Sequence, residues 1–174
     1  MLKYEQNHKL LMPPGHITTF SGKVVNLFNP DPKDILLEDI AHGLAHNCRW
    51  NGHTKTFFSV AEHSVKVARA LPENKQLIGL FHDAEEAYWG DIVSPLKALL
   101  PENILRKIVE FRQVIFVKFD IAEIDDEVNA ADTAQMYWDY EHQIKSFKHT
   151  GITPLAAKKL WLTLATNLLP NKRY

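Results

Sequence analysis

Apolar residues recur every three or four positions along most of the chain, which is the period of an amphipathic helix. The first such stripe begins after Pro32 or Asp34 and contains Leu36, Ile40 and Leu44. The same period predicts further helices over about 57–70 and 74–88, a short helix from residue 94, and helices following Pro101, near Asp125 and from Thr153–Pro154. In the last of these, Thr153 is a side-chain cap and Pro154 occupies the first helical position.

A different pattern precedes the helices. Short apolar segments over 17–20 and 24–28 flank Ser21-Gly22-Lys23, which predicts a β hairpin around a glycine-containing turn. Residues 1–16 contain Pro13-Pro14-Gly15 and are expected to form an N-terminal tail. Since no repeat or linker divides the remainder, we expect one mainly α-helical domain over 17–174, a helical bundle with a small N-terminal β hairpin.

Composition narrows the class of protein. The 174 residues include 20 Lys and Arg against 21 Asp and Glu, which argues against a nucleic-acid coat and predicts no nucleic-acid partner. Cys48 is the single cysteine, so any metal must be held by His and carboxylate side chains. The chain has neither the pattern of a secretory signal nor an apolar run of membrane-spanning length. We therefore expect a soluble cytoplasmic protein with no membrane partner.

The pair His82-Asp83 lies inside an apolar stretch, where adjacent imidazole and carboxylate groups are costly to bury without compensation. A divalent metal would compensate them. Two further candidates, His63 and Asp132, lie on the helices predicted before and after this stretch. Two His and two Asp from packed helices can hold Mn, Co, Fe, Zn or Mg. The alternative is a satisfied core histidine followed by an ordinary helix-surface acid.

These four candidates and the residues around them resemble the motifs of a known protein family. His63, His82-Asp83 and Asp132 follow the pattern of the HD-domain metal phosphohydrolases. The run HDAEEAYWGDIVSPLK at 82–97 resembles the HD-A-x-E-x-x-x-G-D-x-x-[ST]-P-x-K run of the HD-domain 5′-deoxynucleotidases and of small phage and bacterial HD proteins. AEHS at 61–64 and Arg49-Trp50 are similar to other motifs of that group. The resemblance covers about 17–144.

The resemblance assigns roles to individual residues. It makes His63, His82, Asp83 and Asp132 the ligands of one divalent metal ion, and Glu86 the general acid or base. Glu86 is four residues after His82, so we expect it on the same helix face one turn along, beside a water on that metal. Asp91 is expected to contact the sugar or the attacking water. The expected substrate-binding residues are Arg49, Trp50, His53, Ser94 and Lys97.

Each role has a structural alternative. Glu86 could pair with a solvated lysine, Arg49 could be a C-terminal helix cation, Trp50 could belong to the core, and Asp91 could be a turn acid. For His53 a loop contact with phosphate and no role are equally open. A separate pair, His42 and His46, has the spacing of two zinc ligands, but surface or supporting roles are favoured because a third ligand is missing.

Taken together, the residues and the resemblance imply a metal-dependent phosphohydrolase of a small (deoxy)nucleotide, in which a metal-bound water attacks a phosphate. The first expectation is 5′-nucleotidase activity, which releases nucleoside. The alternatives are a dNTP triphosphohydrolase of the dATP-specific type, a nucleotide-binding HD module without activity, and an HD oxygenase. No His occurs between His82 and His142, which disfavours the oxygenase. By analogy with similar enzymes, a homo-oligomer is possible.

Overall fold

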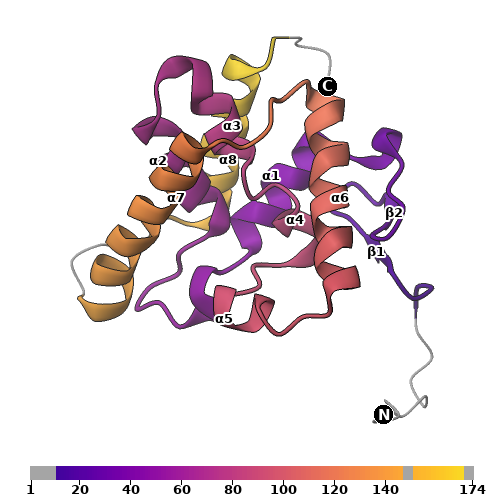
Figure 1. Cartoon of the computed structure of the whole chain (residues 1–174), viewed down its shortest axis with the longest axis horizontal. Helices are drawn as coiled ribbons and strands as arrows, with labels where there is room; N and C mark the ends of the chain where they lie inside the picture. The colour runs from indigo at the N-terminus through magenta and orange to yellow at the C-terminus, as the bar shows by residue number, and fades with distance from the viewer. Residues whose placement is uncertain (1–10, 147–150, 171–174) are drawn as a thin grey trace.

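The computed structural model describes residues 11–146 and 151–170. It is mainly helical with a two-stranded hairpin near the N-terminus, as the sequence predicts (Figure 1). In chain order its strands and α-helices are β1 (His16–Thr18), β2 (Val24–Asn26), α1 (Leu37–His46), α2 (Val60–Ala70), α3 (Gln76–Phe81), α4 (Glu86–Trp89), α5 (Ser94–Lys97), α6 (Glu102–Phe119), α7 (Asp126–Asp139) and α8 (Pro154–Leu168). A π-helical turn, Tyr140–Lys145, continues α7.

The hairpin is antiparallel, with Ile17 opposite Val25. Its first strand begins at His16, the last residue of the expected tail, and residues 1–10 lie outside the described part of the chain. The turn between the strands is fixed to α1, because Asp39 accepts hydrogen bonds of 2.8 Å from the backbone N–H of Ser21 and from Oγ1 of Thr19. The hairpin is therefore attached to the helical core by a buried carboxylate.

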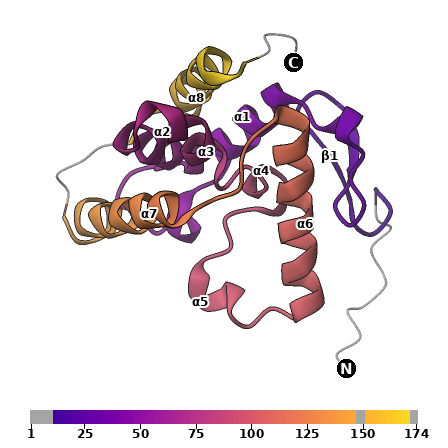
Figure 2. The ribbon, with the colours of Figure 1, turned by 45° about the horizontal axis from the view of Figure 1, so that its top comes forward.

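The core lies between α1, α2, α3 and α8, with α6 packed along one side (Figure 2). Trp161 on α8 is fully buried, its ring centre lies 4.9 Å from that of Phe81, and its indole N–H donates to the carbonyl of Leu80 at 3.2 Å. The structure places Trp161 in the core, against the segment that leads to His82.

The helix expected over 74–88 is interrupted. Helix α3 ends at Phe81 and α4 begins at Glu86, and between them amides bond three residues back, as from Ala84 to Phe81 at 2.9 Å. The ring of His82 is hydrogen-bonded through Nδ1 to the carbonyl of Gly79 at 2.8 Å, an acceptor that an unbroken helix would use for the amide of residue 83. The expectation of one continuous helix through the His-Asp pair was therefore wrong.

Other helices agree with the predictions apart from their ends. The first begins at Leu37, since Pro32–Asp34 forms a separate 3₁₀ turn, and the second begins at Val60, where Ser59 caps it by accepting from the amide of Glu62. Trp138 on α7 is 38% exposed and stacks on His142. Across 11–146 and 151–170, no helix is both long enough and apolar enough to span a membrane.

Candidate metal centre

Three of the predicted ligands converge from different parts of the chain. His63 lies on α2, His82 follows α3 and Asp132 lies on α7, and one ligand atom from each falls within 4.8 Å of the others. Oδ1 of Asp132 lies 2.9 Å from Nε2 of His63 and 3.5 Å from Nε2 of His82. Both imidazoles are buried, whereas the Asp132 side chain is 38% exposed. The arrangement leaves one carboxylate oxygen facing two ring nitrogens.

Asp83, the fourth predicted ligand, lies beside this group. Its Oδ2 is 3.1 Å from Nε2 of His82 and 3.6 Å from Nη1 of Arg49. Burial alone would raise the pKa of Asp83, but the charges of His82 and Arg49 outweigh it and hold that pKa well below its usual range. Burial also lowers the pKa of His82, but Asp83 and Asp132 reverse that effect and raise it well above the usual value.

These side chains fit a divalent ion. They offer imidazole nitrogen and carboxylate oxygen, a mixed set that suits first-row divalent metals. Nε2 of His82 is buried, and although Asp83 and Asp132 are close, no hydrogen bond with good geometry uses it. A buried ring nitrogen in that position is available as a metal ligand. Among the described residues, His63, His82 and Asp132 form a group that could hold a metal ion, and Asp83 lies beside this group.

A further carboxylate, which the sequence analysis missed, supports the cluster. Asp139, fully buried near the end of α7, lies with Oδ2 2.9 Å from Nδ1 of His63, and its Oδ1 accepts a hydrogen bond of 2.8 Å from Nε2 of Gln135. Nζ of Lys66 is 3.9 Å from the same oxygen. The signal in the sequence is the seven-residue interval from Asp132, which places both carboxylates on one face of a helix.

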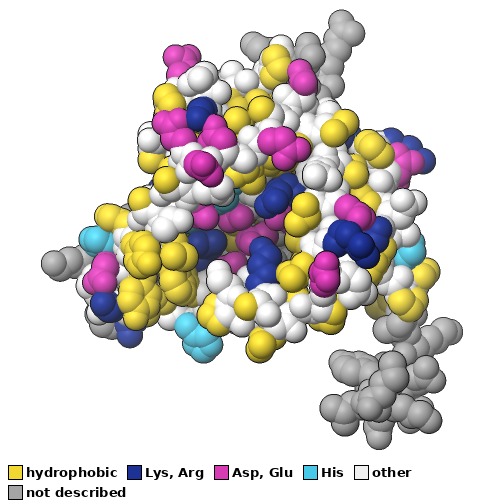
Figure 3. Space-filling view, in the orientation of Figure 1, with side chains coloured by type: hydrophobic (Ala, Val, Ile, Leu, Met, Phe, Trp, Pro, Cys, Tyr) yellow, Lys and Arg dark blue, Asp and Glu magenta, His cyan; other side chains and the backbone are white. Residues whose placement is uncertain are grey.

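A cavity of about 440 Å³ opens over Asp83 and Asp132. Its lining includes most of the residues expected to bind substrate or act in catalysis, namely Arg49, Trp50, Glu86, Asp91, Ser94 and Lys97. In the space-filling view, acidic side chains occupy the depth of the hollow and Lys and Arg side chains surround it (Figure 3). These residues are thus brought together around one opening.

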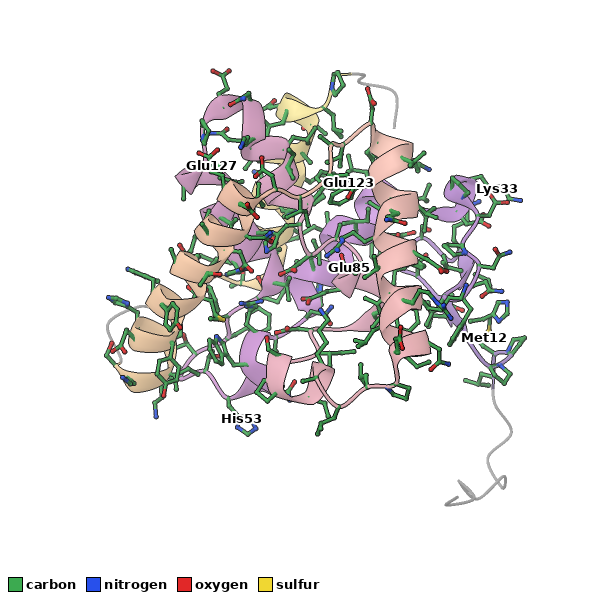
Figure 4. All side chains as sticks on the ribbon, viewed as in Figure 1. Met12, Lys33, His53, Glu85, Glu123 and Glu127 are labelled. Atoms are coloured by element: carbon green, nitrogen blue, oxygen red, sulfur yellow. The ribbon has the colours of Figure 1, made fainter. Side chains whose placement is uncertain are left out.

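Glu86 and its neighbour Glu85 are both buried but have different neighbours. Glu86 lines the cavity, is 5% exposed, and its Oε2 is buried without a hydrogen-bond partner. Burial, reinforced by the charges of Asp83 and Asp91, raises the pKa of Glu86 well above its usual value. Glu85 points into the protein instead (Figure 4), where Oε1 lies 3.5 Å from Nη1 of Arg112. Burial raises the pKa of Glu85 to about 7.

One wall of the cavity is aromatic. Trp50 adopts a left-handed backbone conformation with φ of 57°, and its ring centre lies 5.7 Å from that of Tyr140 on the π-helical turn. Tyr137 on α7 also lines the cavity and is 64% exposed. Neither tyrosine was singled out from the sequence. Their contribution depends on where α7 and its π-helical extension lie, which periodicity does not determine.

Three other histidines that the sequence analysis considered, His42, His46 and His53, lie outside the metal-ligand group. His53 is exposed, lies outside the cavity lining, and projects outward in Figure 4. His42 and His46 stack on each other with ring centres 4.0 Å apart, and Phe20 stacks on His42 at the same distance. They form a surface stack and, within the described residues, are not part of the metal-ligand group.

The fold and the site define a mainly helical protein with a buried His-Asp cluster beneath a cavity. Comparison with known proteins gives 38% identity over 141 residues to an uncharacterized protein of Rhodobacter capsulatus, RCAP_rcc00048, covering 73% of this chain and 71% of that protein. The chain belongs to the family of that protein. It is also 44% identical over 86 residues to the uncharacterized protein YfdR of Escherichia coli K12, a match that covers 49% of this chain and 48% of YfdR. No family model matches the chain.

Proposed function

We propose that the protein is a metal-dependent phosphohydrolase of small nucleotides, built as a single HD domain over 17–174 and acting in the cytoplasm. The observation that carries this proposal is the convergence of His63, His82, Asp83 and Asp132 beneath a cavity that also contains an unpaired buried carboxyl and two cations. A purely structural cluster would have no need of the open volume above it.

His63, His82, Asp83 and Asp132 would hold the ion. When bound, a divalent ion lowers the pKa of water and polarises phosphoryl oxygens. Both imidazoles are buried, and their Nδ1 atoms are hydrogen-bonded within the protein, that of His63 to Asp139 and that of His82 to the carbonyl of Gly79. The protein therefore supplies a preorganised set of donors, which is the condition for selective binding of one ion.

Glu86 is the candidate proton carrier. Its Oε2 faces no hydrogen-bond partner, and burial beside other carboxylates favours its protonated form. A protonated carboxyl can donate a proton to a leaving oxygen and then accept one from water. Asp91 lies in the same cavity, where burial raises its pKa and Arg49 opposes that effect. We assign Asp91 to the sugar or to the attacking water.

The charged and the aromatic parts of the cavity lining would bind different parts of the substrate. Arg49 and Lys97 are the cations among the described residues that line the cavity, and we assign the phosphate to them, with Ser94 alongside. Trp50, with Tyr137 and Tyr140, offers ring faces on which a nucleobase can stack. Two cations match the charge of a monophosphate better than that of a triphosphate, so we favour a 5′-nucleotidase that releases nucleoside and orthophosphate.

Product analysis tests the proposal. Purified protein with Mn²⁺ or Co²⁺ is incubated with deoxynucleoside and ribonucleoside mono- and triphosphates, and the products are separated by chromatography. We expect nucleoside and orthophosphate from monophosphates. The His82→Ala variant should be inactive, whereas His46→Ala, which replaces an exposed histidine outside the cluster, should retain activity. Release of intact triphosphate from dNTPs would identify the triphosphohydrolase, and nucleotide binding without turnover would identify a binding module.

A further inference from the structure

We infer that Asp139 is a positioning residue that fixes His63 as an Nε2 ligand of the metal ion. The inference rests on the proposed metal site and assigns to this chain a support that lies outside the ligand set. It is carried by a pair of contacts on one ring: Asp139 meets Nδ1 of His63 at 2.9 Å, and Asp132 meets Nε2 at 2.9 Å. The imidazole is thus held at both nitrogens by carboxylates of α7.

Asp139 has little freedom of its own. Its side chain is fully buried, and its two oxygens have separate partners. Oδ2 contacts His63, while Oδ1 accepts from Gln135, one helical turn earlier, and lies 3.9 Å from Nζ of Lys66 on α2. A carboxylate restrained at both oxygens transmits its orientation to the ring that it contacts.

The chemical consequence concerns the tautomer of His63. A carboxylate at Nδ1 is an acceptor only, so it favours the ring form that carries hydrogen on Nδ1. Nε2 then presents its lone pair toward Asp132 and Nε2 of His82, where the ion would bind. A carboxylate in this position also increases the basicity of the ligating nitrogen, and loss of such a support typically weakens metal binding about ten- to a hundredfold.

The test compares metal affinities of full-length variants. Mn²⁺ binding is measured by calorimetry for wild type, Asp139→Asn and Asp139→Ala, with Asp126→Ala as the matched control on the exposed start of the same helix. We expect Asp139→Ala to raise the Kd about ten- to a hundredfold. Asp139→Asn, which keeps an acceptor oxygen but removes the charge, should fall between it and wild type. The control should bind as wild type does.

A second measurement needs no variant at Asp139. In the Zn²⁺-loaded wild type, long-range nitrogen NMR reports which nitrogen of His63 carries hydrogen, and we expect Nδ1. Hydrogen on Nε2, or equal Mn²⁺ affinity of wild type and folded Asp139 variants, would overturn the inference while leaving the metal site intact. A wild-type protein that binds neither ion would overturn the metal site and the inference with it. Thermal melting of the metal-free variants separates loss of affinity from loss of fold.

Discussion

Replacement of Gly43 by Ala tests how closely α1 and α4 approach each other. A Cβ built at Gly43 would lie 2.6 Å from the carbonyl oxygen of Ala87 and 2.9 Å from its Cα and Cβ. The first contact is backbone, so no side-chain rotation relieves it. Because Ala87 lies within α4, the short helix that begins at Glu86, the strain falls on the element that carries the candidate proton carrier.

Two effects of opposite sign determine the size of the change. Ala favours a helix interior over Gly by about 1 kcal/mol. Inserting a methyl group into a closed contact costs about 1–3 kcal/mol, since α4 must move away by several tenths of an ångström. We expect the steric effect to win, with a net loss of about 1 kcal/mol or more in the free energy of unfolding. Displacing Glu86 should also lower kcat about tenfold or more.

Urea unfolding followed by circular dichroism measures the first effect, and turnover of the best monophosphate measures the second. The control Ala130→Gly, on the exposed surface of α7, changes helix propensity without a close contact. It should lower the free energy of unfolding by about 1 kcal/mol. A Gly43→Ala protein that is more stable than wild type would refute the close approach of the helices. If Gly43→Ala has the stability and the turnover of wild type, α4 accommodates the methyl group without displacing Glu86, and the prediction is wrong.

Three other measurements address different parts of the structure. Burial lowers the pKa of His82, but Asp83 and Asp132 raise it well above its usual value. Binding of Mn²⁺ must therefore displace a proton from His82, and the affinity measured by calorimetry should rise with pH. A Kd for Mn²⁺ that does not change with pH would contradict this prediction. Burial also raises the pKa of Tyr88, so above pH ~10 its phenol ionises in the unfolded chain before it does in the folded protein. The free energy of unfolding of wild type should therefore fall in this pH range relative to that of Tyr88→Phe. An identical pH dependence of stability in the two proteins would contradict the burial of Tyr88. Trp161→Phe should cost about 1–3 kcal/mol in urea unfolding, because a fully buried indole and its hydrogen bond are lost, and an unchanged midpoint would oppose its place in the core.

The sequence predicted helix starts and the hairpin well, because interactions between residues close together in the chain determine them. Thr153 caps α8 as predicted. Helix α7 begins next to Asp125, as predicted, and the structure shows that Asp125 caps it by accepting from the amides of Glu127 and Val128. The hairpin follows from its alternating segments and the turn at Gly22, which has φ of +84°. These features involve residues close together in the chain, so periodicity and turn chemistry are sufficient.

The parts that were missed depend on tertiary contacts. The break after Phe81 coincides with a side-chain hydrogen bond from the His82 ring to a backbone carbonyl, which periodicity cannot show. The contribution of Asp139 requires that α2 and α7 pack with His63 facing it. Tyr140 lines the cavity from a π-helical turn that has no recognised sequence signal here. Each of these is a consequence of packing between distant segments.

Helix α8 lies outside the resemblance, yet the indole of Trp161 is bonded to the carbonyl of Leu80, two residues before His82. Helix α8 and the turn that carries His82 should consequently open together. In native-state hydrogen exchange, backbone amides of α3 and α8 should share one opening free energy, close to that of global unfolding, whereas those of the hairpin should exchange sooner. Removal of the chain after residue 152 would therefore disable the cluster without touching any of its ligands.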